Sequence, residues 1–360
     1  MNFKFLFFAL SFLAMTACSS DDDVSENHGS QQQSSGVPIS IEVSEEPLTN
    51  TSVAGTRAAI TFKETLTSFK FHILPYGHPN INVFAVASRT NAQDAGNRWV
   101  ANQNWPSDAV DPNTQCYFYA FANVDYDEPD YSLFVPGTTA TPPNGSLNFE
   151  IDEFAEAQMD LLVAKQICTQ NENQVNHKPV HFQFHHACAA LQFSICKTAA
   201  LNDYTVSLKK VKLHNIKKHG TYFFDNDNWE LDNSTSLEED TYADYTLASF
   251  DSSVEVPVES TSTMLLAKNA NDYMFVIPQK VNPWNCQEKT ISENDDGSYY
   301  PGAYLEIECS IVKNGKDYAD SGTVYLPFAD TWEMSYIHRY IIRMGTNLRG
   351  SDGNKINFTL

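Results

Sequence analysis

The sequence lacks the local signatures that most enzymes carry. It contains no GxSxG, HExxH or phosphate-binding loop motif, and its cysteines form no CxxC pair. These absences argue against a serine hydrolase, a zinc protease, a nucleotide-hydrolysing enzyme, and a zinc knuckle or thioredoxin-type redox site. We therefore expect a protein that is not an enzyme, with no catalytic residue and no cofactor.

Positive charge is also scarce. The 360 residues include 23 Lys and Arg against 45 Asp and Glu, which gives a formal net charge of -22 and a pI near 4.7. Nucleic acids and anionic lipid surfaces would repel such a protein. We expect no nucleic-acid partner, and the charge is explained by solubility on a crowded cell exterior.

Long apolar runs are missing as well. The longest one near the N-terminus, Phe5 to Met15, has 11 residues, whereas a membrane-spanning helix needs roughly 20. Lys4 precedes the run and two small residues lead from it to Cys18, the arrangement of a secretory signal peptide. The chain is therefore expected to leave the cytoplasm.

The position of Cys18 resembles that of the acylated cysteine in a bacterial lipobox, although Met15 stands where such boxes usually carry Leu. Ser19 to Asp23 resemble the surface-export signal of Bacteroidetes lipoproteins. We predict a lipoprotein signal peptide in residues 1–18, a flexible tether in 19–36, and anchoring to outer-membrane lipid at the cell surface. The alternative is an ordinary secretory peptide with a chance cysteine.

Six cysteines remain once Cys18 is assigned to lipid. On an oxidising export route they are permitted to form disulfides, and six cysteines allow 15 pairings. Buried free thiols are the alternative, and the spacing selects neither. The six are Cys116, Cys168, Cys188, Cys196, Cys286 and Cys309.

The pattern of the mature chain is almost wholly β. Short runs rich in β-branched and aromatic residues are separated by Gly, Pro, Asn and Asp, which is typical of antiparallel sandwiches. The best helix candidate is the acidic segment Glu150 to Met159. The strand runs are VPISIEV, INVFAVAS, QCYFYAFANV, DLLVAKQI, HFQF, AALQFSICK, YTVSLKKVKLHNI, DYMFVIP, AYLEIECSIVK and GTVYLPF.

The first strand run has one buried face. Val37, Ile39, Ile41 and Val43 alternate with other residues, which is the period of a half-buried strand. We assign 37–57 to an N-terminal strand and candidate pro-segment, 58–178 to a first domain and 179–360 to a second, with the boundary near the polar stretch at 170–179.

Four segments together resemble the fimbrillins and fimbrillin-like lipoproteins of Bacteroidales. TRAAITF resembles the family's Arg-containing junction, and RWVANQNWPSDAV followed by QCYFYAFANVD resembles its tryptophan pattern and following strand. DLLVAKQICTQ with PVHFQFHHACAALQFSI resembles its Asp-Leu-Leu and Phe-x-His-x-x-Ala strands, carried here by Phe184, His186 and Ala189. TWEMSYIHRYIIRMG resembles the closing strand, although Met334 or Ser335 replaces the usual Gly after the Trp.

The resemblance implies an all-β protein of two tandem transthyretin-like antiparallel β-sandwich domains, used as a pilus subunit or adhesin. In this family a protease cuts after an Arg and removes the first strand, and a strand from a neighbouring subunit fills the groove. Arg57 and Ala58 fit that cut, which would detach the strand formed by 37–43. The alternative is that Arg57 is an ordinary linker residue. Other fimbrial subunits are the implied partners, with a host or bacterial surface ligand as a further one.

The end of the sequence offers a second strand. Ile356, Phe358 and Leu360 alternate, so the segment KINFTL fits either a strand donated to a neighbour or the last strand of its own sandwich. The sequence stops at Leu360 with no separate appendage, which favours an anchor, tip or minor subunit over a stalk subunit.

Histidines and acidic residues raise the question of a metal site. His177, His181, His185 and His186 are close in sequence, but His181 and His185 would lie about 13 Å apart along a strand, too far to share one ion. The segment beginning at Asp225 lacks the glycine and glutamate of a calcium loop. We expect no metal site.

A second function remains open, a surface glycan-binding lipoprotein that does not polymerise. It would require exposed tryptophans on one face, whereas packing of the tryptophans in the core would count against it. The five tryptophans are Trp99, Trp105, Trp229, Trp284 and Trp332.

Overall fold

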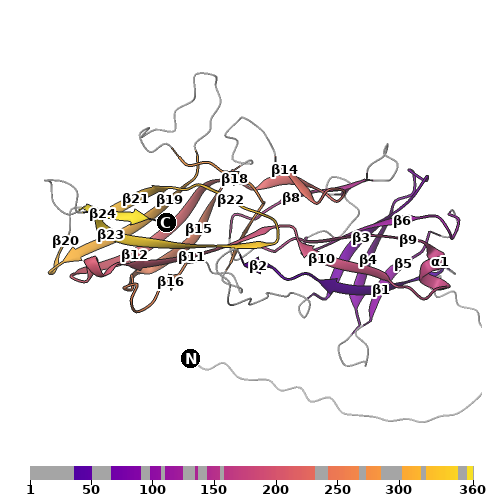
Figure 1. Ribbon diagram of the computed structural model, residues 1–360, viewed down its shortest axis with the longest axis horizontal. Helices are drawn as coiled ribbons and strands as arrows, with labels where there is room; N and C mark the ends of the chain where they lie inside the picture. The colour runs from indigo at the N-terminus through magenta and orange to yellow at the C-terminus, as the bar shows by residue number, and fades with distance from the viewer. Residues whose placement is uncertain are drawn as a thin grey trace, which may run out of the picture. The chain divides into compact units, whose positions relative to one another are not determined.

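The computed structural model consists of β-strands joined by loops, with one short α-helix and one 3-10 turn among the described residues (Figure 1). The structure describes residues 36–50, 66–90, 98–106, 110–124, 134–136, 144–154, 158–231, 242–266, 273–284, 302–317, 322–347 and 355–359. Within them no helix is long and apolar enough to cross a membrane.

The first sheet closes on itself. Each of its strands pairs with two neighbours, so the hydrogen-bonded path returns to its starting strand. In spatial order the strands are β1 (Pro38–Glu45), β10 (Val180–His186), β9 (Leu162–Cys168), β6 (Cys116–Ala122), β3 (Ser68–Pro75), β4 (Val83–Arg89) and β5 (Trp99–Asn104).

Aromatic side chains fill the interior of this closed sheet. Phe69, Phe71, Phe118 and Phe182 are all at most 2% exposed, and their ring centroids lie 5.1–6.1 Å apart in tilted or edge-on contacts. Such contacts add to the free energy gained from burying the rings. We call the buried apolar residues inside this sheet the first core.

Two further large sheets follow along the chain. The second contains β16 (Met264–Leu265), β11 (Ala189–Lys197), β23 (Tyr336–Asn347) and β2 (Thr49–Asn50), with β17 (Met274–Val276) beside β11 and β24 (Lys355–Thr359) beside β23. The third contains β15 (Tyr242–Glu255), β12 (Tyr204–Lys217), β19 (Tyr304–Lys313) and β20 (Lys316–Asp317), with β21 (Gly322–Pro327) beside β19.

The remaining strands form two smaller sheets. One contains β14 (Asn228–Leu231), β13 (His219–Phe223), β8 (Gly145–Glu150) and β7 (Phe134–Pro136), and the other pairs β18 (Lys280–Val281) with β22 (Asp330–Thr331). The helix α1 (Gln170–Gln174) follows β9, and the 3-10 turn η1 (Ala199–Leu201) follows β11. A second core of buried apolar residues contains side chains from the second, third and smaller sheets, together with side chains of β3, β6 and β9 from the first sheet.

Most strand pairs are antiparallel, but three are parallel. They are β1 with β10, β2 with β23, and β11 with β23. Two of the three involve the segment 38–50, in which β1 pairs with β10 of the first sheet and β2 pairs with β23 of the second. The antiparallel pairing expected from the sequence therefore holds for most of the fold, with these three pairs as exceptions.

Strand β10 shows how the chain passes between sheets. It begins at Val180, directly after the predicted boundary at 178/179, and pairs with β9 and β1 of the first sheet. The next strand, β11, starts at Ala189 and belongs to the second sheet. The division into domains 58–178 and 179–360 stays a prediction.

The prediction of a helix over 150–159 was wrong for the residues of this segment that the structure describes. Glu150 ends β8, and Ile151 is 2% exposed and donates its backbone N–H to the carbonyl of Lys218 at 2.9 Å. The side chain of Asp152 accepts from the N–H of Phe154 at 2.7 Å. Burial of Ile151 in the second core and this local turn outweigh the helix propensity of the acidic residues.

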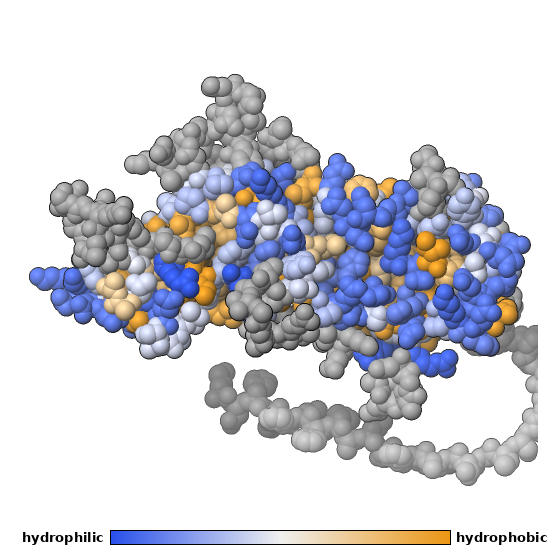
Figure 2. All heavy atoms as spheres, viewed as in Figure 1, coloured by the Kyte–Doolittle hydropathy of each residue, from blue (hydrophilic) through white to orange (hydrophobic). Residues whose placement is uncertain are grey.

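Hydrophilic residues cover most of the described surface on the face shown in Figure 2, and hydrophobic residues occur there in small groups. The most exposed large apolar side chains are those of Val175 and Phe154, at 70% and 61%. Isolated apolar residues of this kind are common on protein surfaces. Most large apolar side chains of the described residues are thus buried in the two cores.

The described cysteines are all buried free thiols: Cys116, Cys168, Cys188, Cys196 and Cys309. Cys116 and Cys168 lie opposite each other in the register of β6 and β9. Burial raises the pKa of Cys116 and of Cys168 to about 12. Because the thiolate is the nucleophile, neither thiol is reactive at neutral pH in the folded protein.

We therefore expect these two thiols to resist alkylation in the reduced, folded protein. Treatment with iodoacetamide at pH 8 should label Cys116 and Cys168 at least about tenfold more slowly in buffer than in urea, because the thiolate fraction falls with the raised pKa. Peptide mass spectrometry after a time course provides the measurement. Equal labelling rates with and without urea would show that the β6–β9 pair is open to solvent.

Candidate functional site

Strand β1 is held on both of its edges. It runs parallel to β10, with Ile41 opposite Val180 and Glu45 opposite Phe184, and antiparallel to β5, with Ile41 opposite Trp99. Figure 1 shows β1 in indigo near the N-terminal end of the described chain. Removing β1 would open the closed sheet and leave unpaired backbone groups along both β5 and β10. We call the space between these two strands the β1 slot.

The face of β1 predicted to be buried does point toward the first core. Ile39 is 6% exposed and belongs to this core, and Val37, Ile41 and Val43 are partly buried and pack against it. Val37 lies just before the strand, and its carbonyl accepts from the backbone N–H of Trp105 at 2.9 Å. The period-2 pattern therefore identified the strand and its inward face.

Asn173 binds the backbone of β1 from the side. The N–H of Ser40 donates to Asn173 Oδ1 at 3.1 Å, and Asn173 Nδ2 donates to the carbonyl of Ser40 at 2.9 Å. The same Oδ1 accepts from the indole N–H of Trp105 at 3.2 Å. Asn173 is 2% exposed, so its amide satisfies polar groups of β1 where water has little access.

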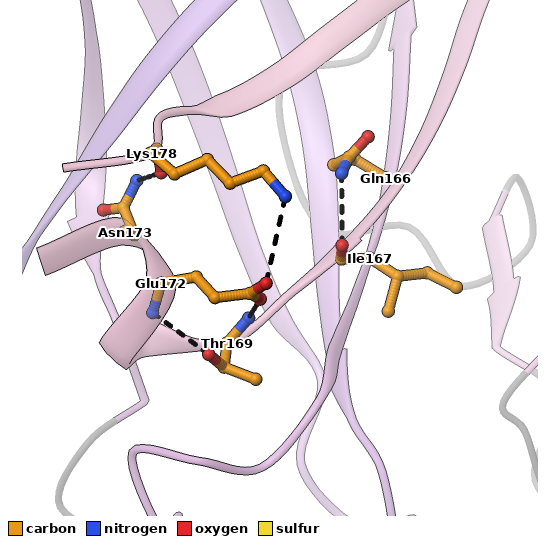
Figure 3. A network of polar contacts seen from close by, with 6 residues as sticks. All are labelled: Gln166, Ile167, Thr169, Glu172, Asn173 and Lys178. Carbon is orange, nitrogen blue, oxygen red and sulfur yellow. Dashed lines mark hydrogen bonds and ion pairs between the residues drawn. The ribbon is translucent and has the colours of Figure 1, made fainter. Parts of the chain in front are cut away.

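A capping box positions Asn173 in α1. The N–H of Glu172 donates to Thr169 Oγ1 at 3.1 Å, and the N–H of Thr169 donates to Glu172 Oε2 at 2.9 Å. Lys178 Nζ lies 3.8 Å from Glu172 Oε1, and the Lys178 carbonyl accepts from Asn173 Nδ2 at 3.0 Å (Figure 3). These contacts stabilise a helix of only five residues, which needs its caps because one turn is weak in isolation.

Three ionisable side chains meet at the end of β1. Glu45, His186 and Asp160 have side chains that are 4%, 0% and 0% exposed. His186 Nδ1 bonds to Asp160 Oδ2, and His186 Nε2 lies 3.5 Å from Glu45 Oε1. We call these three residues the buried charge cluster. From the sequence, His186 was expected only as part of a strand resembling a family motif, and the two acids had no expected role.

The segment after β1 reaches the second sheet. Leu48 is 4% exposed in the second core, and the N–H of Thr49 donates to the carbonyl of Ser335 at 2.8 Å where β2 pairs with β23. Ser335 has a φ of 65° and its hydroxyl donates to the carbonyl of His186 at 2.7 Å. Residues 38–50 thus contribute strands to the first and second sheets, and apolar side chains to both cores.

A cavity of about 260 Å³ lies beside β1. Ile41 and Val43 of β1 line it together with Trp99 of β5 and Phe184 of β10, and Glu42 and Glu45 also border it. The remaining lining residues are Leu66, Arg89 and Leu162. The side chains of β1 therefore leave space in the slot that larger apolar groups would fill.

The histidines of β10 do not assemble a metal site. The described residues contain no group of three or more His, Cys, Asp or Glu side chains arranged to hold a metal ion. His181 Nε2 bonds to Ser44 Oγ at 2.8 Å, and His185 Nε2 bonds to the hydroxyl of Tyr222 at 3.1 Å. His177 is exposed and lies in the connection between α1 and β10, with φ of 52°.

The acidic turn after β13 is explained by local contacts. Asp225 pairs with Lys165 at 2.7 Å, and Asp227 accepts from the hydroxyl of Tyr222 at 2.8 Å. Asp227 has a φ of 48°, as expected for a residue in a tight turn between β13 and β14. These side chains serve the turn and the neighbouring strands.

The tryptophan side chains pack against other residues and are not exposed together on one face. Trp105, Trp229 and Trp332 are at most 9% exposed. Trp99 is half-buried against the first core, and Trp284 is half-buried with its ring centroid 5.1 Å from that of Tyr304. These burials count against a platform of exposed tryptophans for binding glycans.

The other predicted site residues fall partly outside the described structure. Cys18, Arg57, Ala58 and Leu360 lie outside the described residues. The C-terminal segment forms β24, whose backbone at Ile356 and Phe358 pairs antiparallel with β23. This pairing is compatible with a last strand of its own sheet, and donation to a neighbour stays a prediction.

Sequence reasoning missed the groups that hold β1. Asn173 lies in a polar stretch that was read as a domain boundary, although Thr169 and Glu172 form a recognisable capping-box spacing. No local signal connects Asn173 with Ser40, 133 residues away. The cluster of Glu45, Asp160 and His186 likewise appears only when β1, β9 and β10 come together.

Comparisons with known proteins identify a family and similar solved structures. Residues 56–357 match a family model described as fimbrillin-like. A fimbrial protein from Bacteroides vulgatus is 15% identical, with a TM-score of 0.52, over 89% of this chain and 97% of that one. A candidate cell adhesion protein from Parabacteroides distasonis is 10% identical, with a TM-score of 0.44, over 90% and 96%. No curated protein sequence matches the chain.

Proposed function

Because the chain belongs to the fimbrillin-like family, we propose that it is a cell-surface fimbrial subunit or adhesin that assembles by strand exchange at the β1 slot. The observation that carries the proposal is the double-sided pairing of β1 with β5 and β10. A strand in this position, at the N-terminal end of the chain and ahead of Arg57, is one that a single cut would release.

The proposal includes the route by which the protein reaches the surface. Residues 1–18 would direct export, Cys18 would carry the lipid, and 19–36 would tether the folded part to the outer membrane. Residues 58–178 and 179–360 would form two tandem transthyretin-like sandwich domains. The first sheet draws β3, β4, β5, β6 and β9 from 58–178 and the third sheet lies within 179–360, which supports an arrangement of this kind, although β10 and the β8–β13 pair cross the predicted boundary.

Assembly would begin with a cut after Arg57. The released segment would carry away β1 and β2, and with them Ile39 from the first core and Leu48 from the second. Exposed backbone groups on β5 and β10 would then accept a strand from a neighbouring subunit. A surface ligand of host or bacterial origin would be a further partner of the assembled protein.

The cut is testable with an arginine-specific protease. We expect treated wild-type protein to begin at Ala58 and to form multimers on size-exclusion chromatography with light scattering. Protein carrying Arg57→Gln should stay monomeric, because its β1 remains covalently attached. Arg98→Gln, which removes an exposed arginine before β5, is the matched control and should behave as wild type.

Two further measurements complete this test. A peptide spanning Val37 to Val43 should block multimer formation by occupying the slot. The N-terminus and intact mass of protein from its native cell surface would show whether Cys18 is acylated and whether 19–57 are retained. Trimmed protein that stays monomeric without added peptide would rule out polymerisation by this route.

A further inference from the structure

Glu45 differs from the other carboxylates of β1. Its side chain is 4% exposed, whereas Glu42 on the same strand is an exposed residue. A carboxylate removed from water is stable only beside a compensating charge or hydrogen-bond donor. His186 is a positively ionisable partner at hand, since its Nε2 lies 3.5 Å from Glu45 Oε1, and Arg89 lines the same cavity as Glu45.

The surroundings of His186 favour its protonated form. Burial lowers the pKa of His186, but the hydrogen bond and charge of Asp160, followed by the charge of Glu45 and a backbone hydrogen bond with Glu46, outweigh it and raise the pKa overall. Burial raises the pKa of Asp160, and His186 offsets part of that effect. The pKa of the neighbouring His185 is lowered, chiefly by burial, with Asp227 and Glu46 opposing.

The three members of the cluster belong to different parts of the chain. Asp160 precedes β9 and His186 ends β10, so both stay in the protein after a cut at Arg57. Glu45 ends β1 and leaves with it. An emptied slot therefore keeps a buried imidazole and one carboxylate, and lacks the second carboxylate that faced Nε2.

We propose that the β1 slot selects its incoming strand by a carboxylate at the position of Glu45. The partner is a β-strand of a second protein chain that runs parallel to β10, presents apolar side chains at the positions of Ile39, Ile41 and Val43, and carries Asp or Glu two residues later. This inference rests on the proposed strand exchange and adds the chemistry that would decide which strands are accepted.

The apolar positions discriminate less than the carboxylate position. The cavity of about 260 Å³ beside Ile41 and Val43 gives room for larger apolar side chains, so many alternating strands would fit there. A strand with a neutral side chain beside His186 would instead lose the attraction between Nε2 and a second carboxylate, leaving Asp160 as the remaining carboxylate partner, and a Lys or Arg would add a like charge. Strand direction matters too, because reversal would place the carboxylate at the far end of the slot.

The first test uses the intact chain, in which β1 fills its own slot. Glu45→Gln should raise the unfolding equilibrium constant between about 10- and 100-fold, whereas Glu42→Gln should change it by less than about twofold. Introducing Glu45→Gln into a His186→Gln background should no longer destabilise the protein, because the imidazole that Glu45 faced is gone and the carboxylate of Asp160 remains nearby. Urea unfolding followed by tryptophan fluorescence supplies the constants.

The effect of Glu45→Gln should also depend on pH. His186 has a raised pKa in the folded protein, so the stability it contributes is fully present below the unfolded value of about 6.5 and is lost as the pH rises through the folded pKa. The difference between wild type and Glu45→Gln should therefore shrink as the pH rises through that folded pKa. A difference that is the same at every pH would overturn the pairing with an imidazolium.

The second test uses the full chain nicked after Arg57 and labelled peptides of residues 36–50 as incoming strands. The wild-type peptide and its Glu42→Gln form should bind with similar affinity, and the Glu45→Gln form at least about tenfold more weakly. Equal binding of all three would overturn the carboxylate selection and leave strand exchange standing. Failure of the wild-type peptide to bind would overturn strand exchange itself, and this inference with it.

Discussion

Replacing Asn173 with alanine is expected to lower the free energy of unfolding by about 3 kcal/mol, because buried polar groups left without partners cost about 1–3 kcal/mol each. The Ser40 N–H, the Ser40 carbonyl and the Trp105 indole N–H would all lose the Asn173 amide. Of these, Trp105 is 3% exposed, so water cannot easily replace its partner. Urea unfolding at pH 7 provides the measurement.

The matched control is Asn171→Ala in the same helix. Its side chain bonds to Asn113 at an exposed position, so the change should cost no more than about 0.5 kcal/mol. Hydrogen exchange adds local detail, since the Ser40 amide should exchange faster in the Asn173 variant and at the wild-type rate in the control. An unchanged Ser40 exchange rate would show that Asn173 does not hold β1.

Replacing Ile39 with aspartate is expected to have the larger effect, at least about 3 kcal/mol, because it removes a buried apolar side chain and puts a carboxylate in its place. Ile39 is 6% exposed and belongs to the first core. We expect β1 to leave the slot in this variant.

Ile39→Val keeps the shape of the site and should cost only about 1 kcal/mol. Limited proteolysis distinguishes the two variants, because an expelled β1 is cut within residues 38–45 while a bound one is protected. If strand exchange operates, the Ile39→Asp protein should also bind an added 36–50 peptide without any cut at Arg57. Equal protease resistance of the two variants would contradict the role of Ile39 as the buried anchor of β1.

The two variants act on different parts of the same strand. Asn173 binds the backbone of β1 at Ser40 and accepts any strand whose N–H and C=O lie there, whereas Ile39 contributes a side chain to the core. Backbone contacts supply affinity and side-chain contacts supply specificity in strand addition. Glu45, whose carboxylate faces His186 Nε2, is one of the side-chain contacts that would supply specificity.

Local patterns were sufficient to identify strands. The alternation from Val37 to Val43 predicted β1 and its inward face, and the aromatic run at 116–122 predicted β6. Such patterns suffice because the side chains of a strand point alternately to its two faces. A strand with one buried face therefore has apolar residues at every second position. The resemblance to fimbrillins rested on the order of these runs and is confirmed by the family match over 56–357.

Local patterns failed where distant parts of the chain compete for a residue. The acidic residues at 150–159 favour a helix, yet Ile151 is buried in the second core and β8 extends to Glu150. The polar stretch after Cys168 was predicted to lie near a domain boundary, yet it contains the helix whose Asn173 binds β1. Tertiary contacts outweigh local propensity in both segments because propensities amount to less than about 1 kcal/mol per residue.

Neighbouring residues were enough to predict that 37–43 form a strand with one apolar face, that the chain is nearly all β, and that it resembles the fimbrillins. The folded chain was needed to show that this strand lies parallel to β10, that Asn173 satisfies Ser40, and that Glu45 meets His186 and Asp160. The difference lies in the sequence separation of the interacting groups. Burial of a strand face depends on residues two positions apart, whereas pairing and charge compensation join groups more than 100 residues apart, which only the folded chain brings together.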